Sequence, residues 1–177
     1  CGQNKTMSIK QFNGEWVCKE DRVLFRFNTT EDQEFSFWLT RFVLKGLMQG
    51  AQQLTVKSLE REHPKQVAQV MNTFQQEAVK QQLNFQENFE TAKQQPIGAV
   101  PLLVTGLVLN HEGEQVSLRL DTMSGQSVTV KMASHVLQVM LALLDKLQAT
   151  AQWEVGFVNQ DEAASAAGFA TTSASIH

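Results

Sequence analysis

The chain has 177 residues, a formal net charge of −3, 42% hydrophobic residues and 19% charged residues. A chain of this size buries roughly 70% of its unfolded surface when it folds, so the length excludes a large multidomain protein and the composition excludes a wholly disordered one. The slightly acidic charge balance argues against a general polyanion binder. The only two cysteines, Cys1 and Cys18, exclude a disulfide framework and favour a reducing, cytoplasmic compartment.

Residues 1–8 are expected to form a flexible N-terminus, and they allow two interpretations. Met7 marks the natural start of the fold if the first six residues are a fragment edge. Alternatively, the terminus resembles that of a mature bacterial lipoprotein, which implies a lipid anchor at Cys1. No stretch reaches the ~18 uninterrupted apolar residues of a membrane span.

Residues 9–56 predict three strands followed by a helix. A strand is expected over 14–18. Alternation of apolar and polar residues then predicts a hairpin whose buried side chains begin with Val23, Phe25 and Phe27 in one strand and end with Leu39 in the other. The period changes to 3.6 after Thr40, whose hydroxyl is suited to cap the helix.

Residues 57–95 are expected to link this unit to the next through one long helix over 64–92. Apolar residues recur there at helical spacing, and Pro64 is suited to the first helical position. Gly46 and Gly50 in the preceding helix are explained by a close approach of this central helix, or alternatively by neutral drift. The central helix is expected to lie on its own domain or to pair with a partner helix.

Residues 99–149 predict a second strand–strand–strand–helix unit, with a first strand over 102–109 and Ser134 as helix cap. When 23–54 is laid over 116–147 without a gap, seven positions are identical, such as Arg26 and Arg119, whereas composition alone gives about two. The sequence therefore predicts a single α+β domain over 9–158 made of two βββα repeats, related by internal duplication and joined by a long central α-helix. The alternative is that two common hairpin–helix segments resemble each other.

The remaining residues, 159–177, are rich in Ala, Ser, Thr and Gly and are expected to be a disordered tail. Motifs of catalysis and cofactor binding are missing from the chain. The four histidines have no metal-ligand spacing, and neither a phosphate loop nor a nucleophile elbow occurs. We expect no metal, no cofactor and no catalytic residue, with Cys18 a strand residue rather than a nucleophile.

The main functional hypothesis is a non-catalytic binding protein that uses the central helix or an open sheet face. Its partner is another protein or a second copy of the chain, and the expected contact residues are Phe74, Phe85, Phe89 and Trp38. Burial of each such side chain contributes ~1.5–3 kcal/mol.

The alternative is single-stranded nucleic-acid binding through a sheet face that carries Arg26, Trp38, Arg119 and Lys131. Arginine and aromatic side chains on a sheet provide phosphate neutralisation and base stacking. The order of tandem strands and helix resembles, in topology alone, the Whirly and PUR-repeat nucleic-acid binders, although these have four strands per repeat and no motif residue of theirs matches. An enzyme with no recognisable motif is the third possibility.

Overall fold

The computed structural model describes residues 8–82 and 88–153, which form the mixed α+β structure that the sequence predicts. In chain order the elements are β1 (Ile9–Val17), a short 3-10 turn (Cys18–Glu20), β2 (Arg22–Thr29), β3 (Glu34–Thr40), α1 (Arg41–Leu59), α2 (Lys65–Gln82), β4 (Leu102–Glu112), β5 (Gln115–Thr122), β6 (Ser127–Ala133) and α3 (Ser134–Thr150). The expected flexible N-terminus 1–8, except Ser8, and the expected tail 159–177 lie outside the described residues.

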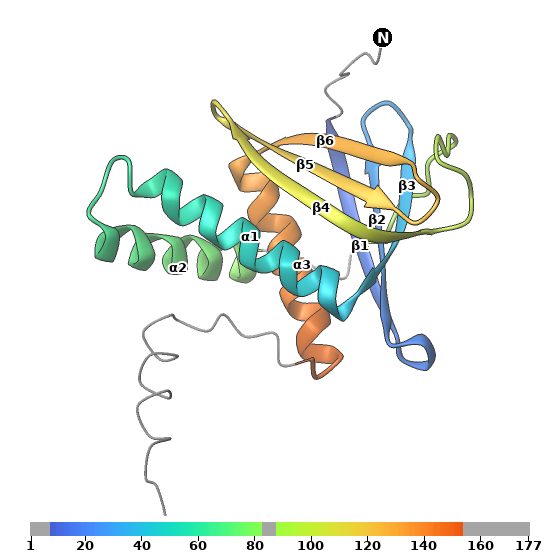
Figure 1. Cartoon of the computed structure of the whole chain (residues 1–177), viewed down its shortest axis with the longest axis horizontal. Helices are drawn as coiled ribbons and strands as arrows, with labels where there is room; N and C mark the ends of the chain where they lie inside the picture. Colours follow the sequence, from blue (N-terminus) through green and yellow to red (C-terminus); the bar gives the residue numbers. More distant parts are fainter. Residues whose placement is uncertain (1–7, 83–87, 154–177) are drawn as a thin grey trace, which may run out of the picture.

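The six strands form one sheet in the order β1-β2-β3-β4-β5-β6. Neighbouring strands are antiparallel except for β3 and β4, which run parallel and pair only through Phe37 with Leu102 and Trp38 with Leu103. Figure 1 shows that the sheet is strongly twisted, so that β4, β5 and β6 cross β1, β2 and β3 at a large angle. The helices α1 and α3 lie against one face, which we call the inner face, and the opposite face is called the outer face.

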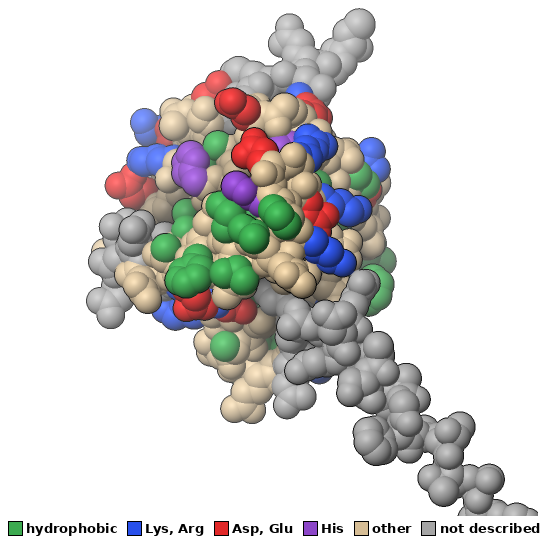
Figure 2. Space-filling model, turned by 90° about the vertical axis from the view of Figure 1, so that its left-hand side faces the viewer, with side chains coloured by type: hydrophobic (Ala, Val, Ile, Leu, Met, Phe, Trp, Pro, Cys, Tyr) green, Lys and Arg blue, Asp and Glu red, His purple; other side chains and the backbone are tan. Residues whose placement is uncertain are grey.

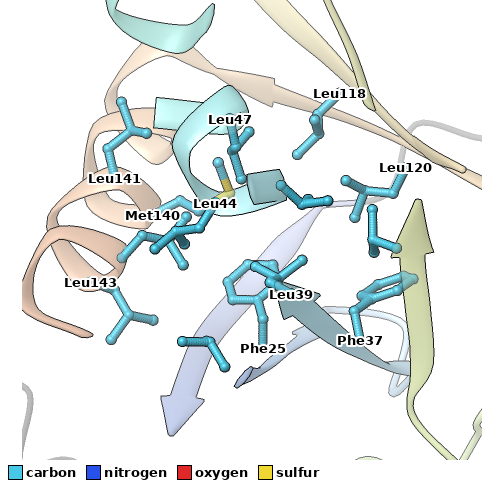
Figure 3. Packing of buried hydrophobic residues seen from close by; sticks show 14 of the residues in the cluster. Phe25, Phe37, Leu39, Leu44, Leu47, Leu118, Leu120, Met140, Leu141 and Leu143 are labelled. Carbon is cyan, nitrogen blue, oxygen red and sulfur yellow. The ribbon is translucent and has the colours of Figure 1, made fainter. Parts of the chain in front are cut away.

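The core lies between the inner face and these two helices. Alternate residues of each strand point inward, so that Phe25 and Phe37 pair across β2 and β3 while Leu118 lies on β5. Figure 3 shows these side chains pointing toward Leu44 of α1 and Met140 of α3. The buried phenylalanine rings of the cluster all come from β2 and β3, whereas β4, β5 and β6 contribute only aliphatic side chains to it.

The β2–β3 and β5–β6 hairpins have the same register at an offset of 93 residues. Val23 pairs with Leu39, and Val116 pairs with Met132. Their loops also share a left-handed residue at the same position, Asp32 with a φ of 60° and Gly125 with a φ of 81°. The helices that follow begin at Arg41 and at Ser134, again 93 residues apart.

Each of these two helices packs against the first strand of the other half. α1 contacts β4, and α3 contacts β1. A Cβ atom at Gly50 of α1 would lie 3.2 Å from Leu109 of β4, and one at Gly14 of β1 would clash with Leu147 of α3 and lie 3.6 Å from Leu143. The prediction that Gly46 and Gly50 accommodate the central helix is therefore wrong, because the close neighbours are Leu107 and Leu109.

The helix predicted over 64–92 is too long. α2 spans Lys65–Gln82, and the described chain after it, 88–94, is not helical. This segment, which we call the strap, crosses the outer face of β1, β2 and β3. Asn28 donates a side-chain hydrogen bond of 2.6 Å to the Glu90 carbonyl, and the Ala92 amide donates one of 3.2 Å to the buried Glu34 carboxylate.

One of the two helix caps predicted from the sequence is present in the structure. The Val43 amide donates to the Thr40 hydroxyl at 3.3 Å, which confirms the cap of α1. The predicted Ser134 cap is wrong, because Ala133 occupies the cap position and Ser134 is the first helical residue. Among the described helices, none is long and apolar enough to cross a membrane.

Candidate functional site

The side of α2 that faces the rest of the molecule combines small, polar and half-buried apolar side chains. It packs on α1 and α3 rather than on the sheet. Ala68 is fully buried, and only 2% of the surface of Asn72 is exposed. The Lys80 ammonium lies 2.7 Å from the Asp145 carboxylate of α3. The contact between α2 and the rest of the protein is therefore partly polar.

The Lys80–Asp145 ion pair links α2 to α3 and shifts the pKa of Lys80. The hydrogen bond and the charge of Asp145 raise the pKa of Lys80 above its usual range, against an opposing effect of burial. A small hollow of about 20 Å³ lies beside the pair, between Met48 of α1 and Leu141 of α3. This volume is about that of one water molecule, so the hollow is too small for a substrate or cofactor.

The opposite side of α2 is apolar and faces solvent. Val67, Val70 and Phe74 recur at spacings of three and four residues, which place them on one side of the helix. Their exposed fractions are 45%, 56% and 72%. Figure 1 shows the α1–α2 pair projecting beyond the sheet, and Figure 2 shows hydrophobic side chains gathered on that end of the molecule beside histidine side chains.

Met71 and Val79 are half-buried, but α2 departs from the usual arrangement of an amphipathic surface helix because part of its apolar surface faces solvent. A surface helix normally buries its apolar side and exposes its polar side. In α2, Asn72 faces inward while Phe74 faces outward. Contiguous exposed apolar side chains of this kind mark interaction surfaces. We define the α2 face as Val67, Val70 and Phe74.

The four aromatic residues expected to bind a partner do not form one surface in the structure. Phe74 belongs to the α2 face, whereas Phe89 lies in the strap and Trp38 lies on the outer face of β3. Phe89 is half-buried beneath the Arg26 guanidinium at 4.8 Å, and the Arg22 guanidinium lies 5.2 Å from the Trp38 ring. Phe85 lies outside the described residues.

The residues of the nucleic-acid alternative do share the outer face of the sheet, but other side chains engage each of them. Arg26 donates to the Asn13 side chain at 2.8 Å. Arg119 lies 3.2 Å from Asp121, and Lys131 lies 2.6 Å from Glu112. These carboxylates neutralise charge that phosphate binding needs.

The pKa of one carboxyl group on this face, that of Asp121, is lowered, as its pairing predicts. The Ser127 hydroxyl donates to Asp121 at 2.7 Å, and this bond together with the Arg119 charge lowers the pKa of Asp121. On the outer face of the second half, Arg119 and Lys131 are thus each paired with a carboxylate. Nucleic-acid binding stays a prediction, and this geometry favours it less than the sequence pattern does.

Val67 and Val70 are functional candidates that the sequence-based hypothesis does not select. Their helical spacing with Phe74 is visible in the sequence, but that spacing by itself indicates an apolar side of a helix and not the direction in which the side points. Within the described ranges 8–82 and 88–153, no group of three or more His, Cys, Asp or Glu residues is placed to hold a metal ion.

Comparison with known proteins adds no functional information: no protein-family model matches the chain, and no curated protein or solved structure is significantly similar to it.

Proposed function

We propose that this chain is a non-catalytic interaction protein and that the α2 face is its binding surface. The observation that carries the proposal is the exposure of the three apolar side chains of the α2 face, with Phe74 72% exposed while the polar Asn72 is buried. Burial of exposed valine and phenylalanine side chains against a partner contributes about 1.5–3 kcal/mol each. Such apolar anchors dominate the energy of protein interfaces.

The test is site-specific photo-crosslinking in the cells from which the chain comes. A photoreactive phenylalanine analogue replaces Phe74 in one full-length variant and Phe42 in a matched control, because Phe42 is 83% exposed on a different helix. We expect a covalent adduct of defined mass from position 74 and none from position 42. The adduct disappears when Val70→Gln is added to the Phe74 variant.

Equal labelling from both positions, or no adduct from position 74, would overturn the proposal. The Val70→Gln change reports on the α2 face itself, since the side chain is 56% exposed and contributes little to the core. Circular dichroism of each variant checks that the helices are retained.

We also infer that the two halves arose by internal duplication of a βββα unit. The offset of 93 residues shared by the hairpin registers supports this inference. A second support is a bulge in the first strand of each half, between Ile9 and Gln11 in β1 and between Val104 and Gly106 in β4. An experimental structure in which the two hairpins have different registers would contradict it.

A cytoplasmic location is proposed on the basis of cysteine usage, with lipid anchoring at Cys1 as the alternative. Cys1 lies outside the described residues. Fractionation of cells into membrane and cytosol, followed by detection of the chain, distinguishes the two.

A further inference from the structure

We propose that the outer face of β1, β2 and β3 binds an extended segment of a partner protein that has an aromatic residue followed by an acidic one, and that the strap occupies this site as an internal competitor. The strap site is defined by Gln11, Arg26, Asn28 and Glu34. In Figure 1 the strap lies on the opposite side of these strands from α1 and α3. The site is therefore separate from the α2 face.

The side chains of the strap site bind the backbone of the strap. The Gln11 amide group accepts a hydrogen bond of 3.1 Å from the Glu90 amide and donates one of 3.0 Å to the Asn88 carbonyl. The bonds of Asn28 and Glu34 continue this pattern, so that the contacts fall on every second residue of the strap. This spacing is that of a strand bound along one side, and it requires an extended backbone rather than a particular sequence.

Two half-buried side chains of the strap show what the site recognises besides the backbone. The Phe89 ring lies 4.8 Å from the Arg26 guanidinium, which donates to the Asn13 side chain at 2.8 Å. Ala92 is the other half-buried residue, whereas the rest of the strap is exposed. The site therefore favours an aromatic residue that is followed, three positions later, by a small one.

Charged side chains beside the strap extend this pattern. Lys10 forms an ion pair with Glu90, which directly follows the aromatic residue. Asp32 lies 3.7 Å from the Lys93 ammonium and accepts a hydrogen bond of 3.3 Å from the Lys93 amide. A complementary partner segment thus has a carboxylate after its aromatic residue and a basic side chain three positions further along.

The second half of the sheet lacks these side chains although its strands pair in the same register. Gly106 takes the place of Gln11, and Ser127 takes the place of Glu34. The residues that bind the strap backbone are therefore not a consequence of the architecture that the two halves share. Their presence in one half alone indicates a surface adapted to an extended occupant.

The contacts of the strap are of a kind that a competing segment can replace. The Lys10 and Glu90 side chains are 52% and 68% exposed, and Lys93 is 89% exposed. Exposed ion pairs contribute little to stability, and a segment with few buried apolar contacts opens at a low free energy. Because the strap is tethered, it competes at an effective concentration on the order of millimolar. A partner segment displaces it by binding the same groups more tightly.

Fluorescence anisotropy of the full chain with a labelled peptide that copies residues 88–94 tests the proposal. The peptide should bind the wild-type chain weakly, because the tethered strap competes with it. Phe89→Ser weakens the strap and should therefore lower the dissociation constant of the peptide at least about tenfold. A control peptide in which serine replaces the phenylalanine should bind this variant at least about tenfold more weakly.

A substitution in the strap site shows whether the peptide binds there. Adding Gln11→Ala to Phe89→Ser removes two backbone contacts and should weaken peptide binding at least about tenfold. Gln115→Ala, which removes an exposed glutamine from β5, is the matched control and should leave binding unchanged. Equal affinity of the wild-type and Phe89→Ser chains, or binding that Gln11→Ala does not weaken, overturns the proposal. Absence of peptide binding by a folded Phe89→Ser chain also overturns it.

Hydrogen exchange of the wild-type chain gives a second readout that needs no substitution. The Glu90 and Ala92 amides donate to Gln11 and Glu34, so excess peptide should accelerate their exchange while the amides between β2 and β3 stay protected. Unchanged exchange of these two amides when the peptide is bound overturns the strap as the occupant that is displaced. Crosslinking from position 74 is independent of both experiments, because it reports on the α2 face.

Discussion

Glu34 shows how a single buried side chain holds a segment that the sequence does not predict. Its carboxylate is only 4% exposed and accepts hydrogen bonds from the Ala92 amide of the strap and from the Ser36 hydroxyl. The backbone amide of Glu34 also donates to the Gln94 carbonyl at 2.8 Å. Because two bonds connect this residue to the strap, Glu34 fixes where the strap crosses the sheet.

We predict that Glu34→Ala lowers the free energy of unfolding by about 1–3 kcal/mol, because the Ala92 amide loses its acceptor in a part-buried position. Urea denaturation of the full chain measures the change. The control is Glu90→Ala, which removes an ion pair with Lys10 whose side chains are 52% and 68% exposed. That loss should be within about 1 kcal/mol, and equal effects would contradict the assigned role of Glu34.

At the scale of elements, the contacts of α1 and α3 show a reversal of small and large side chains. Gly50 of α1 lies against Leu109 of β4, while Leu147 and Leu143 of α3 lie against Gly14 of β1. Residues 50 and 143 are 93 apart, as the hairpin registers are. Each helix therefore approaches its strand closely because one side of the contact has no side chain, but the glycine is on the helix in one half and on the strand in the other.

Two glycine substitutions in α1 should therefore have opposite effects. A Cβ atom at Gly46 would meet only Leu107 at 3.9 Å, so Gly46→Ala should stabilise the protein by about 0.5–1 kcal/mol through helix propensity. Gly50→Leu introduces a side chain whose first carbon alone would already lie 3.2 Å from Leu109, and should destabilise by about 1–3 kcal/mol.

Thermal unfolding followed by circular dichroism measures both changes. Adding Leu109→Ala to Gly50→Leu should recover part of the loss, because it exchanges the small and large partners of the contact. Stabilisation by Gly50→Leu alone would contradict the packing described for α1 and β4.

The Lys80–Asp145 pair joins α2 to α3 and predicts a pH dependence. Because the folded-state pKa of Lys80 is raised, the pair stabilises the folded state fully below the unfolded pKa of about 10.4, and this contribution is lost as pH rises through the higher folded pKa. The Lys80 side chain is 37% exposed, so solvent screening limits the contribution to about 0.2–1 kcal/mol.

The measurement compares urea midpoints of the wild-type chain and Asp145→Asn between neutral and strongly alkaline pH. At neutral pH the wild-type chain should be more stable than Asp145→Asn, and the difference between their urea midpoints should shrink as the pH exceeds 10.5. A difference that grows with pH would contradict the pairing.

At the scale of the whole molecule, the strap and the paired charges make the two sides of the sheet unlike. The inner face is buried beneath α1 and α3, and the outer face is covered by the strap over the first half and by ion pairs over the second. Trp153, at the end of the described chain, donates a hydrogen bond of 2.7 Å from its indole nitrogen to the Asp21 carboxylate. The α2 face lies apart from these arrangements, on the outermost helix.

We predict weak binding of single-stranded oligonucleotides at physiological salt. The net charge is −3, and Arg119 and Lys131 already have carboxylate partners. Titration followed by tryptophan fluorescence tests this at two salt concentrations, since Trp38 lies on the face in question. Strong quenching that decreases with salt would favour the nucleic-acid alternative instead.

The sequence by itself determined the features that depend on neighbouring residues. Alternation around Val23 and Val116 predicts the two hairpins, and Thr40 predicts the start of α1, because strand faces and helix caps involve residues only a few positions apart. These expectations are confirmed in the structure. The predicted end of the second helix lies too far along the chain because the apolar spacing continues to Phe89, where the chain has already left the helix.

The tertiary structure decided where each apolar surface points. The spacing of Val67, Val70 and Phe74 indicates that they share a side of α2, but that side faces solvent because α1 and α3 already fill the inner face of the sheet. The place of α2 on the outside, with Lys80 held by Asp145, depends on contacts between segments far apart in the chain. Local periodicity contains no information about such contacts, so the candidate binding surface emerges only in the folded molecule.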